Sequence, residues 1–419
     1  MDAPILLKIL VSLALILVSN KLLKNLSYAV LLGTLTLALW SGHSLAGMAE
    51  IAGRRFLSLD NGALLVVIFF VIWLSSQMDK TGVMRDLVEN IRSYLSPRSA
   101  MAVLPAVIGL LPMPGGALFS APLVDDCDTE NQVPAQLKSQ VNYWFRHIWE
   151  FFWPLYPGVI LAMELADLEV HQMLLIGSPM VLTMIAGGYF FILRRVHLSS
   201  KRGAPSEHHV LSLLSPILIL ILIYALIMVF FPSLSHANKY LPMIIGLSGA
   251  MGLLQLQRPL GWGQWKSIFL SSRALNMGII VALIRIYGAF IEARLPSGVL
   301  LMEQMRVELD SVGIPIVLLV MLISFISGLT TGVSLGFVGA SLPIAFSLLG
   351  ADADLSTRMG ILAMTYPFGF IGIMLSPVHV CFIVTSEHFK TSLLRSMGRI
   401  LPPSALILLI ASILGLVLL

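Results

Sequence analysis

The sequence predicts an all-α polytopic membrane protein built from two repeats of inverted topology. Three observations predict this fold. Of the 419 residues, 57% are hydrophobic and only 11% are charged, and the mean hydropathy is +0.91, which is typical of a helical membrane protein. Apolar runs long enough to cross a bilayer recur along the chain. Each half also holds one apolar stretch that glycines or prolines interrupt.

The first repeat is expected to comprise residues 1–200 and to end in the polar linker 194–209. The segment 54–59 predicts a surface or interfacial piece before the third span. The elements expected in order are spans at about 4–20, 26–40 and 61–79, a re-entrant hairpin at about 99–124, a broken helix at about 139–165 and a span at about 172–193.

The second repeat, residues 201–419, is expected to follow the same order. Its spans lie at about 210–231, 239–256 and 273–293, its hairpin at about 312–348, its broken helix at about 358–385 and its last span at about 399–419. Because a re-entrant hairpin returns to its own side, about ten full spans result. Most Lys and Arg residues then fall on one side of the membrane, as the positive-inside rule requires.

The two interrupted stretches are the first candidates for a binding site. They read GLLPMPGGALFSAPL at 109–123 and GLTTGVSLGFVGASLPI at 328–344. Prolines break a helix, and lipid cannot satisfy the backbone groups that are freed. Matched interruptions in two halves are typical of a transporter site, whereas small residues alone could simply allow tight helix packing. The tip candidates for substrate binding are Pro112, Met113, Pro114, Gly115 and Gly116, and Thr330, Thr331, Gly332 and Ser334.

The first broken helix carries a polar group of candidates. Asn142, Arg146 and Glu150 are spaced i, i+4 and i+8, so a continuous helix would present them on one face. We expect Asn142 and Arg146 to bind an anionic substrate, with His147 as a further candidate, and His147 or Glu150 to move a proton. The alternative is an Arg146–Glu150 ion pair near the cytoplasmic interface of the membrane.

Three candidates come from the second half. Arg285 lies near the middle of a predicted span without a charged neighbour within one turn, so it is a substrate-binding candidate; structural pairing with hairpin carbonyls is the alternative. His379 follows Pro377 and could titrate near neutral pH, or simply pack through a hydrogen bond. Ser376 belongs to the stretch at 374–378 that matches 153–157 in the first broken helix.

Several chemistries are not expected. Cys127 and Cys381 lie far apart without a CxxC pattern, so we expect neither a disulfide nor a metal site. The sequence contains no GxxxxGK[ST] pattern and no His/Glu metal motif, so we expect no cofactor, no ATP-driven pump and no enzyme. The net charge of +4 comes from loop Lys and Arg residues and concerns orientation rather than nucleic-acid binding.

Three motifs carry a resemblance to a known family. They are LPMPGGALFSAPLVD at 111–125, NYWFRHIWEFFWPLYPG at 142–158 and SGLTTG at 327–332. With them the chain resembles the DUF401 integral-membrane family of the ion transporter superfamily, which also holds gluconate permeases and dicarboxylate and citrate carriers. The resemblance implies inverted repeats, an elevator-like mechanism and a multi-pass protein of the prokaryotic cytoplasmic membrane. The Ser-Asn-Thr motif of sodium-coupled dicarboxylate carriers is absent from both tips.

The sequence therefore predicts a secondary transporter of a small anion, with an organic acid as the expected substrate and H⁺ or Na⁺ as the coupling cation. The alternative is a sodium–proton antiporter that uses a buried carboxylate. Glu150 is the first candidate for that carboxylate, ahead of Glu164 and Asp79. The expected partners are the anion, the coupling cation and the lipid bilayer, and a homodimer is left open.

Overall fold

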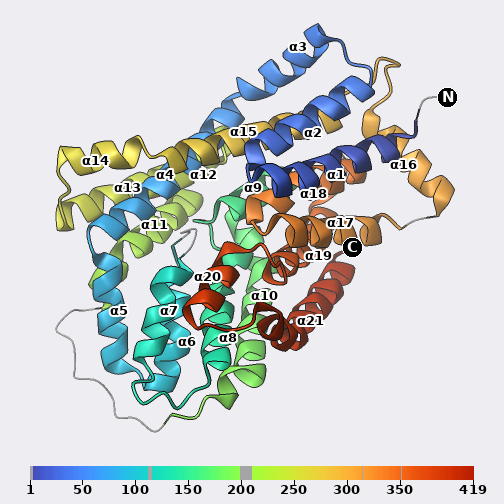
Figure 1. Ribbon diagram of the computed structural model, residues 1–419. Coiled ribbons are helices and arrows are strands. Elements are labelled where there is room, and N and C mark those ends of the chain that lie inside the picture. Colours follow the sequence, from blue (N-terminus) through green and yellow to red (C-terminus); the bar gives the residue numbers. More distant parts are fainter. Residues whose placement is uncertain (1–2, 112–115, 199–209, 314, 351) are drawn as a thin grey trace.

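The computed structural model describes residues 3–111, 116–198, 210–313, 315–350 and 352–419 (Figure 1). Within these ranges every regular element is a helix, and the only β-type pairing is an isolated bridge between Arg294 and Leu300. The predicted all-α fold is confirmed. The predicted tip residues Pro112, Met113, Pro114 and Gly115 lie outside the described residues.

Six segments in the described ranges are long and apolar enough to cross a membrane, so the chain is an integral membrane protein. They contain the long helices of the fold. These are α1 (Ile5–Leu23), α4 (Leu59–Lys80), α10 (Val170–Phe191), α11 (Val210–Phe230), α15 (Ser272–Ile291) and α21 (Leu393–Leu418), with α14 (Trp262–Phe269) leading into α15 and the short η2 (Leu193–Arg195) following α10.

Two pairs of shorter helices lie where the sequence is interrupted. The first pair is α6 (Pro97–Ile108) and α7 (Ala117–Asp126), which pack against each other. The second is α17 (Ile316–Thr331) and α18 (Ser334–Leu349), joined by Gly332 and Val333. Gly332 has a φ of +65°, a left-handed conformation that side-chain-bearing residues rarely adopt, so glycine makes this turn possible.

An interrupted helix follows each pair. In the first half, α8 (Ala135–Arg146) ends early, the 3₁₀ turn η1 (Ile148–Phe151) follows, and α9 begins only at Pro157 (Pro157–Ala166). In the second half, α19 (Leu355–Met374) is separated from α20 (Val380–His388) by a break that contains Pro377. Proline favours such ends because it lacks a backbone donor, and it fits well at the first position of α9.

The remaining helices are shorter. They are α2 (Leu26–Trp40), α3 (Leu45–Phe56), α5 (Val83–Tyr94), α12 (Pro232–Ala237), α13 (Leu241–Gln257) and α16 (Leu301–Val312). The expected surface piece at 54–59 spans the end of α3 and the start of α4, where Ser58 caps α4 by accepting a hydrogen bond from the Asn61 amide. Helices α3, α5, α12, α14 and α16 were not predicted from the sequence.

Helices from the two halves of the sequence pack together throughout the molecule. Helix α2 packs against α15, α4 against α13 and α15, α10 against α21, and α9 against α18 (Figure 1). Helix α20 packs against α7 and α8. The two interrupted helices therefore meet across the sequence halves, and their breaks come together in the interior.

Candidate functional site

A cavity of about 670 Å³ lies where the interrupted elements meet. Its walls come from the α8–η1–α9 segment, the turn between α17 and α18, the start of α20, and parts of α1, α4 and α15. This volume is in the range of sites for small molecules. Many of the residues predicted from the sequence line it: Arg146, His147, Glu150, Thr330, Thr331, Gly332, Ser334 and His379.

Arg146 brings a positive charge to this cavity. It is the last residue of α8 and is only 2% exposed. Gly116, at the start of α7, lies directly against it: a Cβ added to Gly116 would stand 2.3 Å from Nη2 of Arg146 and 2.9 Å from Cζ. Gly116, which the sequence predicted at the tip, therefore packs against the guanidinium and does not line the cavity. Gly109 packs equally closely against the backbone of Arg146, since a Cβ added to Gly109 would lie 2.1 Å from the Arg146 carbonyl oxygen.

His147 and Glu150 continue the wall beyond Arg146. Nδ1 of His147 lies 2.6 Å from the Tyr143 carbonyl oxygen, to which it donates its proton. Nε2 is then the ring nitrogen with a lone pair; it lies 3.4 Å from Nη1 of Arg146 and 3.8 Å from Oε1 of Glu150. Burial of a histidine and a carboxylate beside a cavity is typical of proton relays in transporters.

The predicted common face of Asn142, Arg146 and Glu150 is not formed. The α-helix ends at Arg146 and a 3₁₀ turn begins at Ile148, so the spacing of four residues no longer holds for Glu150. Asn142 is fully buried and donates from Nδ2 to Oγ1 of Thr385 at 3.0 Å, tying α8 to α20. It does not line the cavity.

Hydroxyls of the second tip bond mainly to their own helix. Oγ1 of Thr330 donates to the Ile326 carbonyl at 2.6 Å, and Oγ1 of Thr331 to the Ser327 carbonyl at 2.7 Å. Their oxygen lone pairs stay able to accept a hydrogen bond from a ligand. Ser334 opens α18 and packs closely on the start of α9, since a Cβ on Gly158 would lie 2.7 Å from its Cβ.

The break between α19 and α20 is held on α17. Ser376 is fully buried and donates from Oγ to the Leu329 carbonyl at 2.6 Å, so it positions the break instead of lining the cavity. Gly332, in the turn after α17, also packs closely against this break, because a Cβ added to it would lie 3.0 Å from the His379 amide nitrogen. His379 is 7% exposed and faces the cavity.

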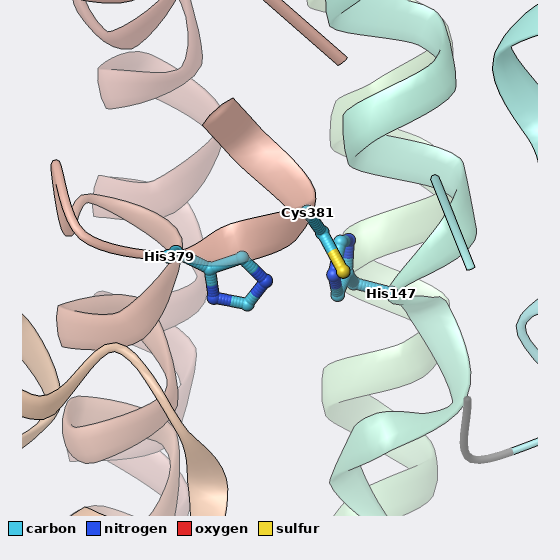
Figure 2. Close-up of side chains that lie close together, drawn as sticks. All are labelled: His147, His379 and Cys381. Carbon is cyan, nitrogen blue, oxygen red and sulfur yellow. The ribbon is translucent and has the colours of Figure 1, made fainter. Parts of the chain in front are cut away.

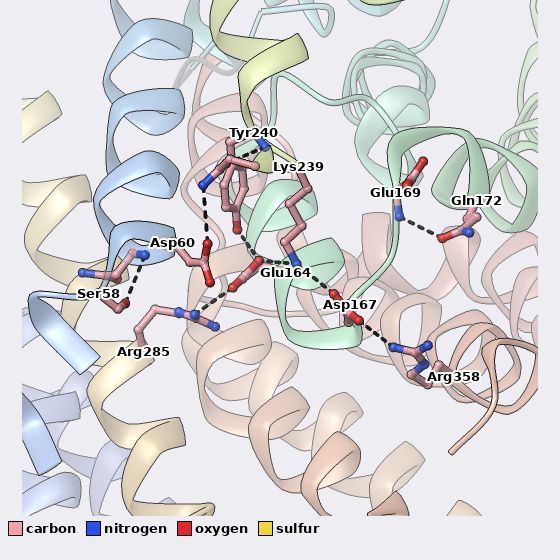
Figure 3. A network of polar contacts seen from close by, with 12 residues as sticks. Ser58, Asp60, Glu164, Asp167, Glu169, Gln172, Lys239, Tyr240, Arg285 and Arg358 are labelled. Atoms are coloured by element: carbon pink, nitrogen blue, oxygen red, sulfur yellow. Dashed lines mark hydrogen bonds and ion pairs between the residues drawn. The ribbon is translucent and has the colours of Figure 1, made fainter. Parts of the chain in front are cut away.

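Arg285 lies in a different part of the molecule. Its Nη2 lies 2.7 Å from Oε1 of Glu164 on α9, and both side chains are buried (Figure 3). Lys239 and the Tyr240 hydroxyl both bond to Oε2 of Glu164. Arg285 is therefore not the lone arginine that the sequence indicated: its partner is remote in sequence, and it does not line the cavity.

Cys381 is a cavity residue that sequence reasoning missed. One ring nitrogen of His147, one ring nitrogen of His379 and the sulfur of Cys381 lie within 4.8 Å of one another (Figure 2). The spacing between the two cysteines carries no sign of this cluster, and no local pattern in the sequence connects position 147 with 379 and 381. Cys127 lies elsewhere, with its thiol donating to the Leu123 carbonyl at 3.2 Å.

Comparisons with known proteins give one family and one related fold. A protein-family model described as "Protein of unknown function (DUF401)" matches residues 6–418. Among solved structures, the crystal structure of the Alcanivorax borkumensis YdaH transporter, described as having an unusual topology, is similar with a TM-score of 0.56 over 89% of each chain. The two sequences are 13% identical, so the likeness concerns the fold. No curated protein matches the sequence.

Proposed function

This chain belongs to the DUF401 family, and we propose that it is a secondary active transporter of a small anion, with an organic acid as substrate and H⁺ or Na⁺ as the coupling ion. The observation that carries the proposal is the buried guanidinium of Arg146 in the wall of a cavity of about 670 Å³. The similarity in fold to a membrane transporter supports the same class of function.

The electrostatics of the cavity favour an anion. Removing a carboxylate from water costs several kcal/mol even after relaxation, so a binding site must supply compensating charge. Arg146 supplies a planar guanidinium that can bond both oxygens of a carboxylate. Helices also begin at the cavity wall, among them those that start at Pro157, Ser334 and Val380, and the N-terminus of a helix attracts negative charge.

The same wall offers groups for a coupling ion. Helices α8 and α17 end at it, and the C-terminus of a helix carries partial negative charge. Glu150 and His147 can carry a proton, and exposed carbonyls with a carboxylate can bind Na⁺. Half-helix N-termini for an anion together with C-termini for a cation are the arrangement found in coupled transporters with broken helices.

The proposed architecture follows from the order of the elements. The pair α6–α7 and the pair α17–α18 are re-entrant hairpins, and the two sequence halves are inverted repeats with about ten full spans in total. The hairpins and interrupted helices form a mobile transport part, and the remaining helices form a scaffold. Elevator-like movement of the transport part then exposes the cavity to each side in turn. The repeated order of hairpin and interrupted helix supports this proposal.

A sodium–proton antiporter is the second candidate, because Glu150 is a buried carboxylate that lines the cavity. Two observations count against it. Arg146 lines the same cavity, and in an antiporter no bound anion would neutralise its charge, so it would repel Na⁺. The other carboxylate candidates lie elsewhere: Glu164 is bonded to Arg285, Lys239 and Tyr240, and Asp79 is exposed at the end of α4.

The test begins with purified protein and a panel of organic acids, each with and without Na⁺, using thermal stabilisation as the measure of binding. Acids that bind are then followed as radiolabelled substrates in proteoliposomes. Arg146→Gln should weaken binding by about 10–100-fold, the loss expected for charge-assisted hydrogen bonds. Arg146→Lys should weaken it less, because the charge is kept but the two-pronged geometry is lost.

Arg258→Gln is the matched control. Arg258 pairs with Asp86 and bonds the Thr81 carbonyl, and it does not line the cavity, so this variant should bind the acid as the wild type does. The proposal fails if the wild type moves Na⁺ against H⁺ and carries no anion. It also fails if Arg146→Gln and Arg258→Gln transport the same acid equally well.

A further inference from the structure

We propose that His147, His379 and Cys381 form a binding site for a borderline-soft transition-metal ion of the Zn²⁺ type inside the cavity. This inference rests on the geometry of the three side chains and does not depend on the proposed anion transport. The site would join two chain segments that are remote in sequence, the end of α8 and the start of α20.

The three donor atoms are already close together. The two ring nitrogens and the sulfur lie within 4.8 Å of one another, and the side chains converge from two facing segments (Figure 2). In a tetrahedral zinc site, bonds of 2.0–2.3 Å place neighbouring donors about 3.3–3.8 Å apart. Small side-chain rotations would therefore complete the coordination. All three residues are buried, which excludes the trivial explanation of a chance cluster on the surface.

The surroundings of both histidines are compatible with a metal ion. His147 donates from Nδ1 to the Tyr143 carbonyl, so Nε2 carries the lone pair; metal-binding histidines are commonly oriented in this way. This lone pair faces Nη1 of Arg146 at 3.4 Å, a long hydrogen bond that the metal ion would replace. Nδ1 of His379 forms no hydrogen bond with any described residue, although the side chain is 7% exposed. A buried polar atom without a partner is costly, and a metal ion would supply the missing partner.

The surrounding charges permit a divalent ion. The Cys381 thiol loses its proton on coordination and contributes a negative charge. The guanidinium of Arg146 lies 3.4 Å from Nε2 of His147 and opposes the ion. The carboxylate of Glu150 lies 3.8 Å from the same nitrogen, offsets this repulsion, and can serve as the fourth ligand.

The donor set also selects the class of metal. Two imidazoles and a thiolate suit Zn²⁺ and Co²⁺, whereas Mg²⁺ and Ca²⁺ prefer sites made only of oxygen. The fourth position, which Glu150 can fill, lies beside the cavity, because Glu150 and all three donor residues line it. A metal ion would therefore enter this site through the cavity.

The test uses Co²⁺ as a spectroscopic probe on chelator-treated protein in detergent. The wild type should bind one equivalent, with a thiolate-to-cobalt charge-transfer band, and Zn²⁺ should displace it. Cys381→Ser should lose this band, and His379→Gln should weaken binding at least about tenfold. Cys127→Ser is the control, since Cys127 is the other cysteine in the sequence and lies outside the cluster; it should keep the band.

Thermal unfolding with Zn²⁺ provides a second readout if Cys381→Ser does not fold. Binding to the native state raises the melting temperature, so Zn²⁺ should stabilise the wild type and Cys127→Ser but not His147→Gln or His379→Gln. The absence of saturable Co²⁺ binding in the wild type would overturn the proposal. So would a charge-transfer band that survives in Cys381→Ser or disappears in Cys127→Ser. Organic acids do not enter this experiment, so it stands apart from the anion assay.

Discussion

Nη2 of Arg285 on α15 lies 2.7 Å from Oε1 of Glu164 on α9, and both side chains are buried. The network extends further, because Asp167 bonds Lys239 at 3.0 Å and Arg358 at 2.8 Å (Figure 3). Helix α9 is thereby tied to α15, to the start of α13 and to α19. In the proposed mechanism α9 belongs to the mobile part and α15 to the scaffold, so this ion pair would hold one end state of the movement.

The first prediction concerns the strength of this ion pair. Arg285→Ala should destabilise the protein by about 2–3 kcal/mol, because it leaves part of the buried charge of Glu164 without its partner while Lys239 still neutralises the rest. The Arg285→Ala/Glu164→Ala double variant should lose less stability than the sum of the losses in the two single variants. Unfolding in detergent measures both quantities.

Arg54→Ala is the control for this experiment, since Arg54 pairs with Glu50 at an exposed site and such pairs contribute little. Anion affinity of folded Arg285→Ala should stay at the wild-type level, because Arg285 does not line the cavity. A large loss of affinity with unchanged stability would show that Arg285 acts on the substrate after all.

The second prediction tests the contact between Gly116 and Arg146. Gly116→Ala would place a methyl group 2.3 Å from Nη2, so the guanidinium must move. The backbone itself accepts alanine, since φ of Gly116 is −55°. Anion affinity should fall about tenfold or more, while the protein still folds.

Gly252→Ala is the matched control, because a Cβ at this position in α13 meets no described atom within 4 Å. It should leave affinity unchanged and stability equal or slightly higher, as expected for alanine in a helix. Equal anion affinity in Gly116→Ala and Gly252→Ala would contradict the assigned role of Arg146.

The sequence predicted the membrane helices because their signal is local. An apolar run long enough to span is visible residue by residue, and the runs at 4–20, 26–40 and 61–79 correspond to α1, α2 and α4. Helix α5 was missed because it is amphipathic and short: its apolar residues are interleaved with charged ones, so no apolar run appears. Its buried face becomes visible only when α4, α6 and α11 are packed beside it.

In the candidate site too, residues that stand out within one stretch of sequence could be predicted, whereas contacts between remote segments could not. Arg146, His147 and Glu150 could be found because charged residues in an apolar stretch are conspicuous. The Glu164–Arg285 pair and the position of Cys381 could not, because each depends on contacts between remote segments. The helical spacing of Asn142 and Glu150 misled because α8 ends at Arg146, and a spacing rule assumes an unbroken helix.

The third prediction concerns pH and the loop between α7 and α8. Asp128 accepts hydrogen bonds from the Gln132 and Val133 amides and lies 3.0 Å from Nζ of Lys138. Burial alone would raise the pKa of Asp128, but the Val133 amide, Lys138 and the Gln132 amide together hold this pKa below its ordinary value. A lowered pKa in the folded state stabilises the fold at pH values above the ordinary pKa of the group, and this contribution is lost as pH falls through the folded pKa.

Asp128→Asn should therefore be less stable than the wild type at pH 6.5. The difference should shrink below about pH 4, where aspartate in the unfolded chain takes up protons. Melting temperatures in detergent across this range provide the measurement, and Glu130→Gln, at an exposed position of the same loop, is the control. A difference that stays constant with pH would show that the charge of Asp128 contributes nothing.

The last prediction separates proton-coupled anion transport from sodium–proton antiport through Glu150. This carboxylate lines the cavity beside Arg146 and His147, and its backbone carbonyl accepts a hydrogen bond from the Tyr366 hydroxyl at 2.9 Å. Glu150→Gln keeps the size of the side chain but removes the group that gains and loses a proton. In the proton-coupled form of the anion transporter, Arg146 still holds the substrate, so one anion can still exchange for another across the membrane. Accumulation driven by a proton gradient should disappear, because no proton accompanies the anion.

If the protein is a sodium–proton antiporter, Glu150→Gln should instead lose Na⁺/H⁺ exchange completely. Neither the wild type nor the variant should then show anion counterflow. Both activities are measured in the same proteoliposomes, with labelled anion for counterflow and a trapped pH-sensitive dye for proton movement.

Retention of counterflow together with loss of proton-driven uptake in Glu150→Gln would support proton coupling at Glu150. Gradient-driven uptake at the wild-type rate in Glu150→Gln would exclude this carboxylate from coupling.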